Sequence, residues 1–76
     1  MDRKEIVLEV LARVSGVERR SIGSESELVG DLGIDSPRAL AMLVELEDRL
    51  ETEIDDKLVT RLNTVADVLR AIGQPG

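Results

Sequence analysis

The chain has 76 residues, of which 42% are hydrophobic, and a formal net charge of −6 at neutral pH. It contains no Cys, His, Phe, Tyr or Trp, which excludes disulfides, thiol nucleophiles, imidazole acid–base chemistry and aromatic platforms for stacking bases. A chain of this length buries about 60% of its unfolded surface, so we expect one small domain over residues 1–76 without a deep catalytic cleft.

The first predicted elements are a helix and a long loop. Apolar residues at helical spacing predict a helix over residues 2–15, with Asp2 and Glu5 forming a capping box and Gly16 ending the helix in the left-handed conformation. Residues 16–35 then form a long connection in which apolar residues recur between polar clusters. We expect this loop to be ordered against the core, with a short turn of helix near 25–29.

The second helix is predicted over residues 36–50. Ser36 takes the cap position and Pro37 the first helical position, where the amide hydrogen that proline lacks would be unpaired. Apolar residues cover more of this helix than packing against one core requires. The expected core stripe consists of Ala39, Leu43, Leu46 and Leu50, with Leu40 and Met42 on its borders.

One short and one longer helix complete the prediction. Asp55 or Asp56 opens a short helical turn, and the last helix begins at Thr64, with Asp67 placed for a reciprocal cap. Residues 73–76 stop that helix and are expected to fray. The fold class is therefore all-α: a small four-helix up-and-down bundle, three main helices and one short one, with a long loop between helices 1 and 2.

Local chemistry leaves three interpretations of Ser36 open. Its hydroxyl caps the helix, is phosphorylated ahead of Pro37, or is the attachment point of a larger group. A phosphodiester there would meet free amide hydrogens and the positive end of the helix dipole, whereas Asp35 would repel it unless a cation or a basic partner lay between them. Because the chain has no histidine, Ser36 has no base of its own and must be modified by another enzyme.

Three blocks of the sequence resemble the acyl carrier protein family. Residues 31–36 read D-L-G-I-D-S, which is similar to the D-L-G-x-D-S signature around the modified serine of that family. Residues 43–54 resemble its acidic second helix with the E-L-E-x-x-[FL]-x-x-x-I ending, and residues 63–68 resemble the T-V-x-D-x start of its last helix. The spacing between the blocks fits, and together they cover nearly the whole chain.

The resemblance implies a carrier and not an enzyme. Ser36 would receive 4′-phosphopantetheine from coenzyme A, and Asp35 would serve recognition or metal-assisted transfer by the phosphopantetheinyl transferase. The arm ends in a thiol and would hold acyl or related intermediates as thioesters. Partner enzymes of fatty acid, polyketide or other specialised biosynthesis would load and process that cargo, and tethering would raise its effective concentration.

The acidic middle of the chain predicts the kind of partner. Residues 25–56 carry eleven acidic and two basic side chains, a net −9, so we expect enzymes with basic docking surfaces and no nucleic acid as partners. Met42 and Val44 border a partner site or an acyl tunnel, with core packing as the alternative for Met42, and Glu47 leans against the core. The expected partner contacts are Pro37, Ala41, Val44, Glu45 and Asp48.

Two of these positions depart from the family pattern. Pro37 stands where many members have a leucine that touches partners, and Ala41 stands where fatty-acid carriers often have an acidic residue. The changes indicate a specialised carrier with dedicated enzymes.

Two rival functions remain: an unmodified acidic helical adaptor for a basic protein, and a small enzyme, which the lack of His and Cys disfavours. No signal peptide or membrane-spanning run is evident, so we expect a cytoplasmic monomer without membrane insertion. We expect no metal site, because capping explains the acidic pairs Glu25/Glu27 and Asp55/Asp56 better than a divalent cation does.

Overall fold

The computed structural model describes residues 2–73, without the side chains at positions 56, 58 and 59. Within that range the regular structure is helical, with one isolated antiparallel β-bridge between Glu27 and Thr64. The elements are α1 (Arg3–Ser15), the 3₁₀ helix η1 (Arg19–Ser21), α2 (Ser36–Leu50), the 3₁₀ helix η2 (Asp56–Arg61) and α3 (Val65–Ala71). The all-α prediction of three main helices, one short helix and a long first loop is confirmed, and the short helix η2 is of the 3₁₀ type.

Local caps explain where α1 and α3 begin and end. The Asp2 carboxylate accepts the Glu5 amide at 2.8 Å, and Gly16 ends α1 with a φ of 78°. Thr64 and Asp67 form the predicted reciprocal cap at the start of α3. The expected frayed tail lies outside the described residues from position 74 on.

The predicted turn of helix near 25–29 is not a regular helix, and its helical-type hydrogen bonds lie slightly later: the Asp31 amide donates to the Glu27 carbonyl at 2.9 Å and the Gly33 amide to the Val29 carbonyl at 3.0 Å. The helical turn of this loop is η1, nearer the end of α1, while residues 24–32 form turns. The backbone groups of this segment are paired with the chain that leads into α3: the Leu28 amide donates to the Asn63 carbonyl at 2.8 Å, and the Val65 amide donates to the Ser26 carbonyl at 3.1 Å. These long-range hydrogen bonds hold the segment against the start of α3.

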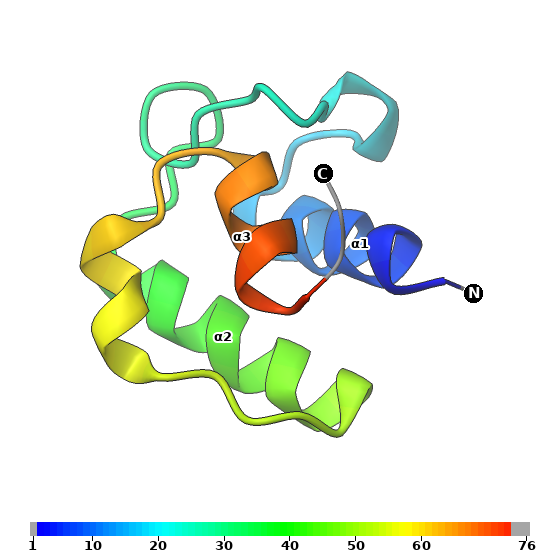
Figure 1. Ribbon diagram of the computed structural model, residues 1–76. Helices are drawn as coiled ribbons and strands as arrows, with labels where there is room; N and C mark the ends of the chain where they lie inside the picture. The colour runs from blue at the N-terminus through cyan, green and yellow to red at the C-terminus, as the bar shows by residue number, and fades with distance from the viewer. Residues whose placement is uncertain (1, 74–76) are drawn as a thin grey trace.

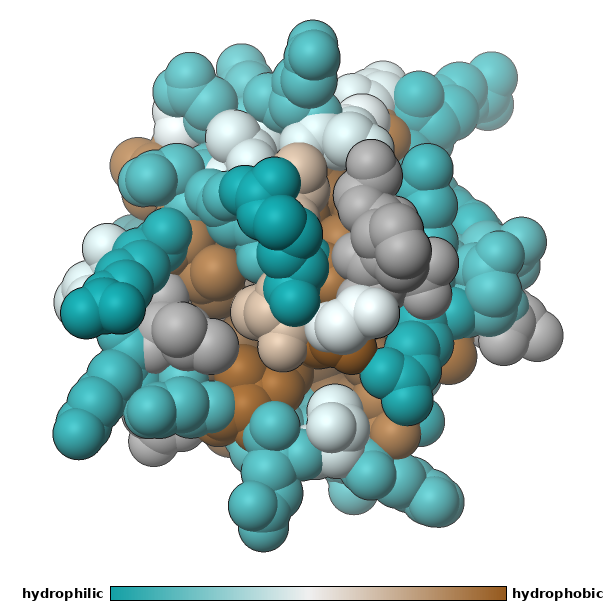
Figure 2. All heavy atoms as spheres, viewed as in Figure 1, coloured by the Kyte–Doolittle hydropathy of each residue, from teal (hydrophilic) through white to brown (hydrophobic). Residues whose placement is uncertain are grey.

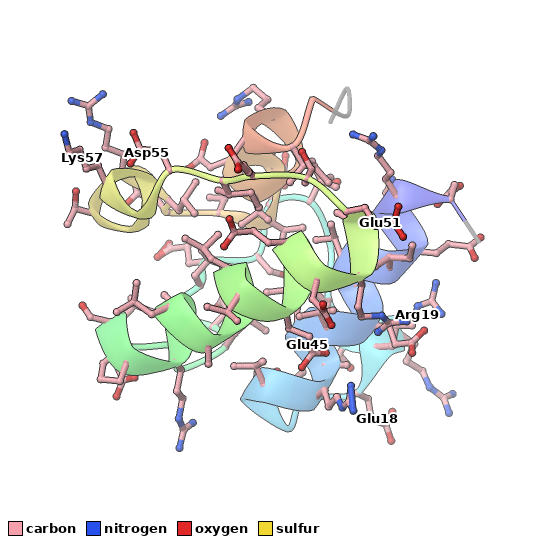
Figure 3. The ribbon with its side chains drawn as sticks, turned by 90° about the horizontal axis from the view of Figure 1, so that it is seen from below. Glu18, Arg19, Glu45, Glu51, Asp55 and Lys57 are labelled. Carbon is pink, nitrogen blue, oxygen red and sulfur yellow. The ribbon has the colours of Figure 1, made fainter. Side chains whose placement is uncertain are left out.

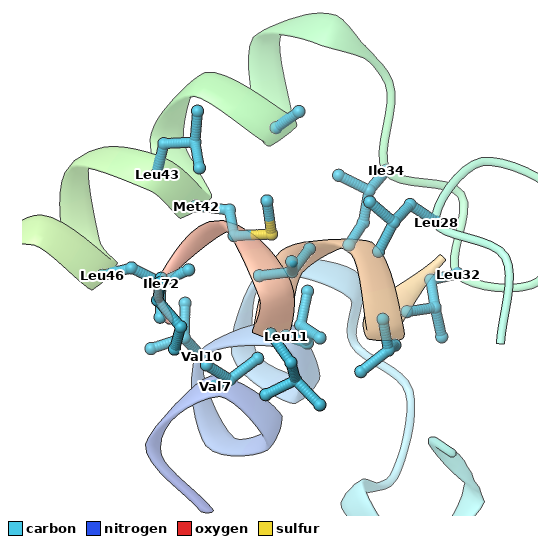
Figure 4. Close-up of a cluster of buried hydrophobic side chains, with 14 of the residues drawn as sticks. Val7, Val10, Leu11, Leu28, Leu32, Ile34, Met42, Leu43, Leu46 and Ile72 are labelled. Atoms are coloured by element: carbon cyan, nitrogen blue, oxygen red, sulfur yellow. The ribbon is translucent and has the colours of Figure 1, made fainter. Parts of the chain in front are cut away.

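The three α-helices and the loop enclose one aliphatic core (Figures 1 and 4). Figure 1 shows α3 in front of α1 and above α2, with η2 joining α2 to α3 at one side. Met42 is fully buried and lies among side chains from α3 and the loop, so the core-packing interpretation of this residue is the correct one. No helix within residues 2–73 is long and apolar enough to cross a membrane.

Candidate functional site

The loop segment before α2 is fixed by its own residues. The Asp31 carboxylate accepts the Glu27 amide at 2.7 Å and closes a turn, and Gly33 has a φ of 65°, which favours glycine. Leu32 and Ile34 are 5% and 1% exposed and anchor the segment in the core. These residues together fix the path of the backbone into the start of α2.

Asp35 caps α2, and the predicted cap at Ser36 is wrong. Asp35 has an extended backbone, and its Oδ1 accepts the Arg38 amide at 3.2 Å, while Ser36 is the first and Pro37 the second residue within the helix. The Ala39 amide donates to the Asp35 carbonyl at 2.8 Å, so the first helical turn already closes on Asp35. The buried Ile34 places Asp35 at this position, one residue earlier than the Ser-Pro pattern predicts.

Ser36 presents its hydroxyl to solvent. The residue is exposed, and no hydrogen bond of its hydroxyl is found within residues 2–73. With the cap supplied by Asp35, the helix start does not depend on this hydroxyl. A covalent arm on Ser36 therefore fits the structure without displacing a packed side chain.

The expectation of several free amides around a phosphate on Ser36 needs correction. Pro37 has no amide hydrogen, and the Arg38 amide is engaged by Asp35, so two of the donors of the first turn are lost. The positive end of the helix dipole remains, and Arg38 adds an exposed guanidinium two residues from Ser36. Arg38 is thus a candidate, within this chain, for the cation that would offset the repulsion between the Asp35 carboxylate and a phosphate on Ser36.

Four of the five expected partner contacts form one row on the solvent side of α2. Pro37, Ala41, Val44 and Asp48 follow at i, i+4, i+7 and i+11, and all four are exposed. We call this row the docking stripe. Its first three members are apolar and only its last is charged, so the face beside Ser36 is less acidic than composition suggests.

Exposed hydrophobic side chains widen the apolar part of this surface. Val44 is 63% exposed, and Leu40, on the border of the docking stripe, is 43% exposed. In the view of Figure 2, which is that of Figure 1, hydrophobic atoms are visible between hydrophilic side chains in the lower half of the molecule. An exposed apolar surface of this kind is suited to contact with a protein.

The fifth expected contact, Glu45, is held by α1. Its Oε2 lies 2.9 Å from Nη1 of Arg13, and the side chain of Glu45 is 30% exposed. Figure 3 shows Glu45 on the side of α2 that faces α1. A second pair, Arg49 with Glu9 at 3.3 Å, joins the same two helices. Neither pair is predictable from helical spacing, because their partners are 32 and 40 residues apart in the chain.

Two further expectations about carboxylates hold. Glu47 leans inward, and its Oε2 accepts the Ile54 amide at 2.9 Å. Asp55 accepts the Lys57 amide at 2.9 Å and caps η2 as predicted, whereas no capping hydrogen bond of the Glu25 or Glu27 side chain is found within residues 2–73. The side chain of Asp56 lies outside the described part of the structure.

One surface pocket formed by the described residues lies away from α2, the helix along which an acyl tunnel is expected. That pocket is open and is lined by Leu8, Ile22 and residues 18–20, which belong to α1 and the first loop. None of its lining residues comes from α2.

Comparisons with known proteins show what the whole chain is similar to. The sequence profile of the phosphopantetheine attachment site family matches residues 5–72. Acyl carrier proteins of Wolinella succinogenes and Campylobacter curvus are 37% and 32% identical to the chain over 71 and 75 residues, which are 93% and 99% of this chain and 88% and 92% of theirs. A solved structure from Mycobacterium tuberculosis, provisionally named an acyl carrier protein, is 28% identical and superposes with a TM-score of 0.85 over 95% of this chain and 96% of its own.

Proposed function

The chain belongs to the acyl carrier protein family, whose members are non-catalytic carriers of a phosphopantetheine arm, and from that premise we propose that Ser36 is its attachment residue. The observation that carries the proposal is the exposed, unbonded hydroxyl of Ser36 at the start of α2. Asp35 holds that helix start and offers a carboxylate to the transferase.

The chemistry requires a second protein. In the transfer, an oxygen–phosphorus bond forms at Ser36, the diphosphate bond of coenzyme A breaks, and adenosine 3′,5′-bisphosphate leaves. The hydroxyl proton passes to a base of the phosphopantetheinyl transferase, because this chain has no histidine to accept it. The bound arm supplies a thiol that carries acyl or related cargo as a thioester.

The partners of this carrier are the transferase and the enzymes that load and process the cargo. The docking stripe beside Ser36 is the contact surface that the exposed apolar residues of α2 favour. Pro37 and Ala41 in this stripe, together with Arg38, support a specialised carrier with dedicated enzymes in preference to the general carrier of fatty acid synthesis.

Modification with coenzyme A tests the attachment residue. Incubation with a broad-specificity phosphopantetheinyl transferase is expected to raise the intact mass by one phosphopantetheine, and Ser36→Ala is expected to abolish the gain. Ser21→Ala, which removes another exposed serine, is the matched control and is expected to show the full mass gain. A full gain in Ser36→Ala, or no gain in the natural chain with several transferases, would overturn the proposal.

A further inference from the structure

The ion pair between Arg13 and Glu45 has a consequence for the choice of partner. We propose that Arg13 of α1 withholds Glu45 from partners, so that α2 selects enzymes whose docking patch is apolar with a cation opposite Asp48. This inference rests on the proposed carrier function. It is drawn from the 2.9 Å contact between Nη1 of Arg13 and Oε2 of Glu45, which joins α1 to α2 at the edge of the docking stripe.

The carboxylates in the second half of α2 are not equivalent. Glu45 is paired with Arg13, and Glu47 is turned inward to the Ile54 amide. Asp48 is exposed on the docking stripe itself. A partner that approaches this face therefore meets one outward carboxylate where the sequence shows three.

The position of Asp48 sets the shape of the matching partner. Asp48 lies about 18 Å along the helix axis from Ser36, at 1.5 Å per residue. Between them the docking stripe offers Pro37, Ala41 and Val44, which an apolar patch on the partner covers. A partner with its cation aimed at Glu45 has to displace Arg13 first, which disfavours it.

The expected size of this selection follows from the exposure of the pair. The side chains of Arg13 and Glu45 are 65% and 30% exposed, so solvent and salt screen their attraction. Freeing Glu45 is then worth roughly a two- to fivefold change in the association of a basic partner.

A charge-matched pair of variants tests the proposal. Arg13→Gln frees Glu45, whereas Arg20→Gln frees Glu18, its 3.2 Å partner, away from α2. Both variants lose one positive charge. With one broad-specificity transferase that has a basic docking surface, and with coenzyme A, kcat/KM for the mass gain is expected to rise about two- to fivefold in Arg13→Gln and to stay unchanged in Arg20→Gln. The rise is expected to shrink as salt is added.

Two further variants tie the effect to the ion pair. Arg13→Lys keeps a cation and is expected to behave like the natural chain. When Glu45→Gln is already present, adding Arg13→Gln is expected to give no further rise in kcat/KM. Equal effects of Arg13→Gln and Arg20→Gln, no effect, or a gain that persists without Glu45 would overturn the inference. Since the natural chain is modified in all of those outcomes, they leave the carrier function standing, whereas absence of any modification would overturn both.

Discussion

Asp35 and Ser36 share the start of α2, and the structure divides two tasks between them. The carboxylate of Asp35 holds the helix, while the hydroxyl of Ser36 stays exposed. Both residue types are good caps, so the sequence pattern alone does not decide which one fills the position. The choice depends on Gly33 and Ile34, which set the path of the chain into the helix through a positive φ and a buried side chain.

Substitution of Asp35 separates its structural role from its recognition role. Asp35→Ala removes the cap and is expected to lower the free energy of unfolding by about 1 kcal/mol, whereas Asp35→Asn keeps a capping oxygen and most of the stability. Both variants lose the charge and are expected to slow phosphopantetheine transfer to a similar degree. Urea unfolding and the rate of mass gain measure the two effects. Modification of Asp35→Asn at the natural rate would limit Asp35 to a structural role.

The helices are predictable from the sequence because the residues next to each helix end determine where it begins and stops. The caps Asp2 and Thr64 and the terminal Gly16 placed α1 and α3 to within one or two residues. The turns of the first loop are not predictable from local sequence alone, because part of their backbone pairs with residues more than 30 positions away: the Leu28 amide donates to the Asn63 carbonyl, and the Ser26 carbonyl accepts the Val65 amide. The same limit applies to the site: the proposed role of Ser36 follows from a motif, whereas the pairing of Glu45 with Arg13 does not follow from any local pattern.

The capping box of α3 predicts a dependence of stability on pH. Hydrogen bonds from the backbone amides of Asn63 and Thr64, supported by the nearby Arg70, hold the pKa of Asp67 below its ordinary value of 3.8. A carboxylate with a lowered pKa in the folded state stabilises the protein above its unfolded pKa, and this contribution is lost as the pH falls through the folded pKa.

Asp67→Asn removes that contribution while keeping a capping oxygen. We expect the variant to be less stable than the natural chain at pH 7 and the difference to narrow as the pH falls below about 4. Urea unfolding of both proteins at pH 7, 5 and 3 measures this difference in stability. A difference that is constant over this range would contradict the role of the charge.

At the scale of the whole molecule, stability depends on a core without aromatic side chains. The fully buried residues are Leu, Ile, Val and Met, drawn from the three α-helices and the first loop. Composition predicted this aliphatic core, and the net charge of the middle segment predicted an acidic surface. Composition did not show which acidic groups face outward, because ion pairs between α1 and α2 are set only when the helices pack.

Met42 tests how much of the domain depends on one central side chain. Because Met42 has no exposed surface, Met42→Ala is expected to cost about 2–5 kcal/mol in the free energy of unfolding. The exposed Val44 on the same helix is the control, and Val44→Ala is expected to change stability by at most about 0.5 kcal/mol. Chemical denaturation of both variants decides; equal costs would contradict the packing described for α2.

The hydrogen bonds between the first loop and the entrance of α3 connect the start of α3 to the segment that leads into α2. The Asn63 carbonyl accepts the Leu28 amide, and the Leu28 carbonyl accepts the Ile34 amide at 2.8 Å, two residues before Ser36. In hydrogen–deuterium exchange, the amides of Leu28, Ile34 and Val65 are expected to open together with one free energy, and widely different values would contradict the linkage. Because these hydrogen bonds join the entrance of α3 to the segment that leads into α2, a displacement of α3 is expected to move the start of α2 and with it Ser36.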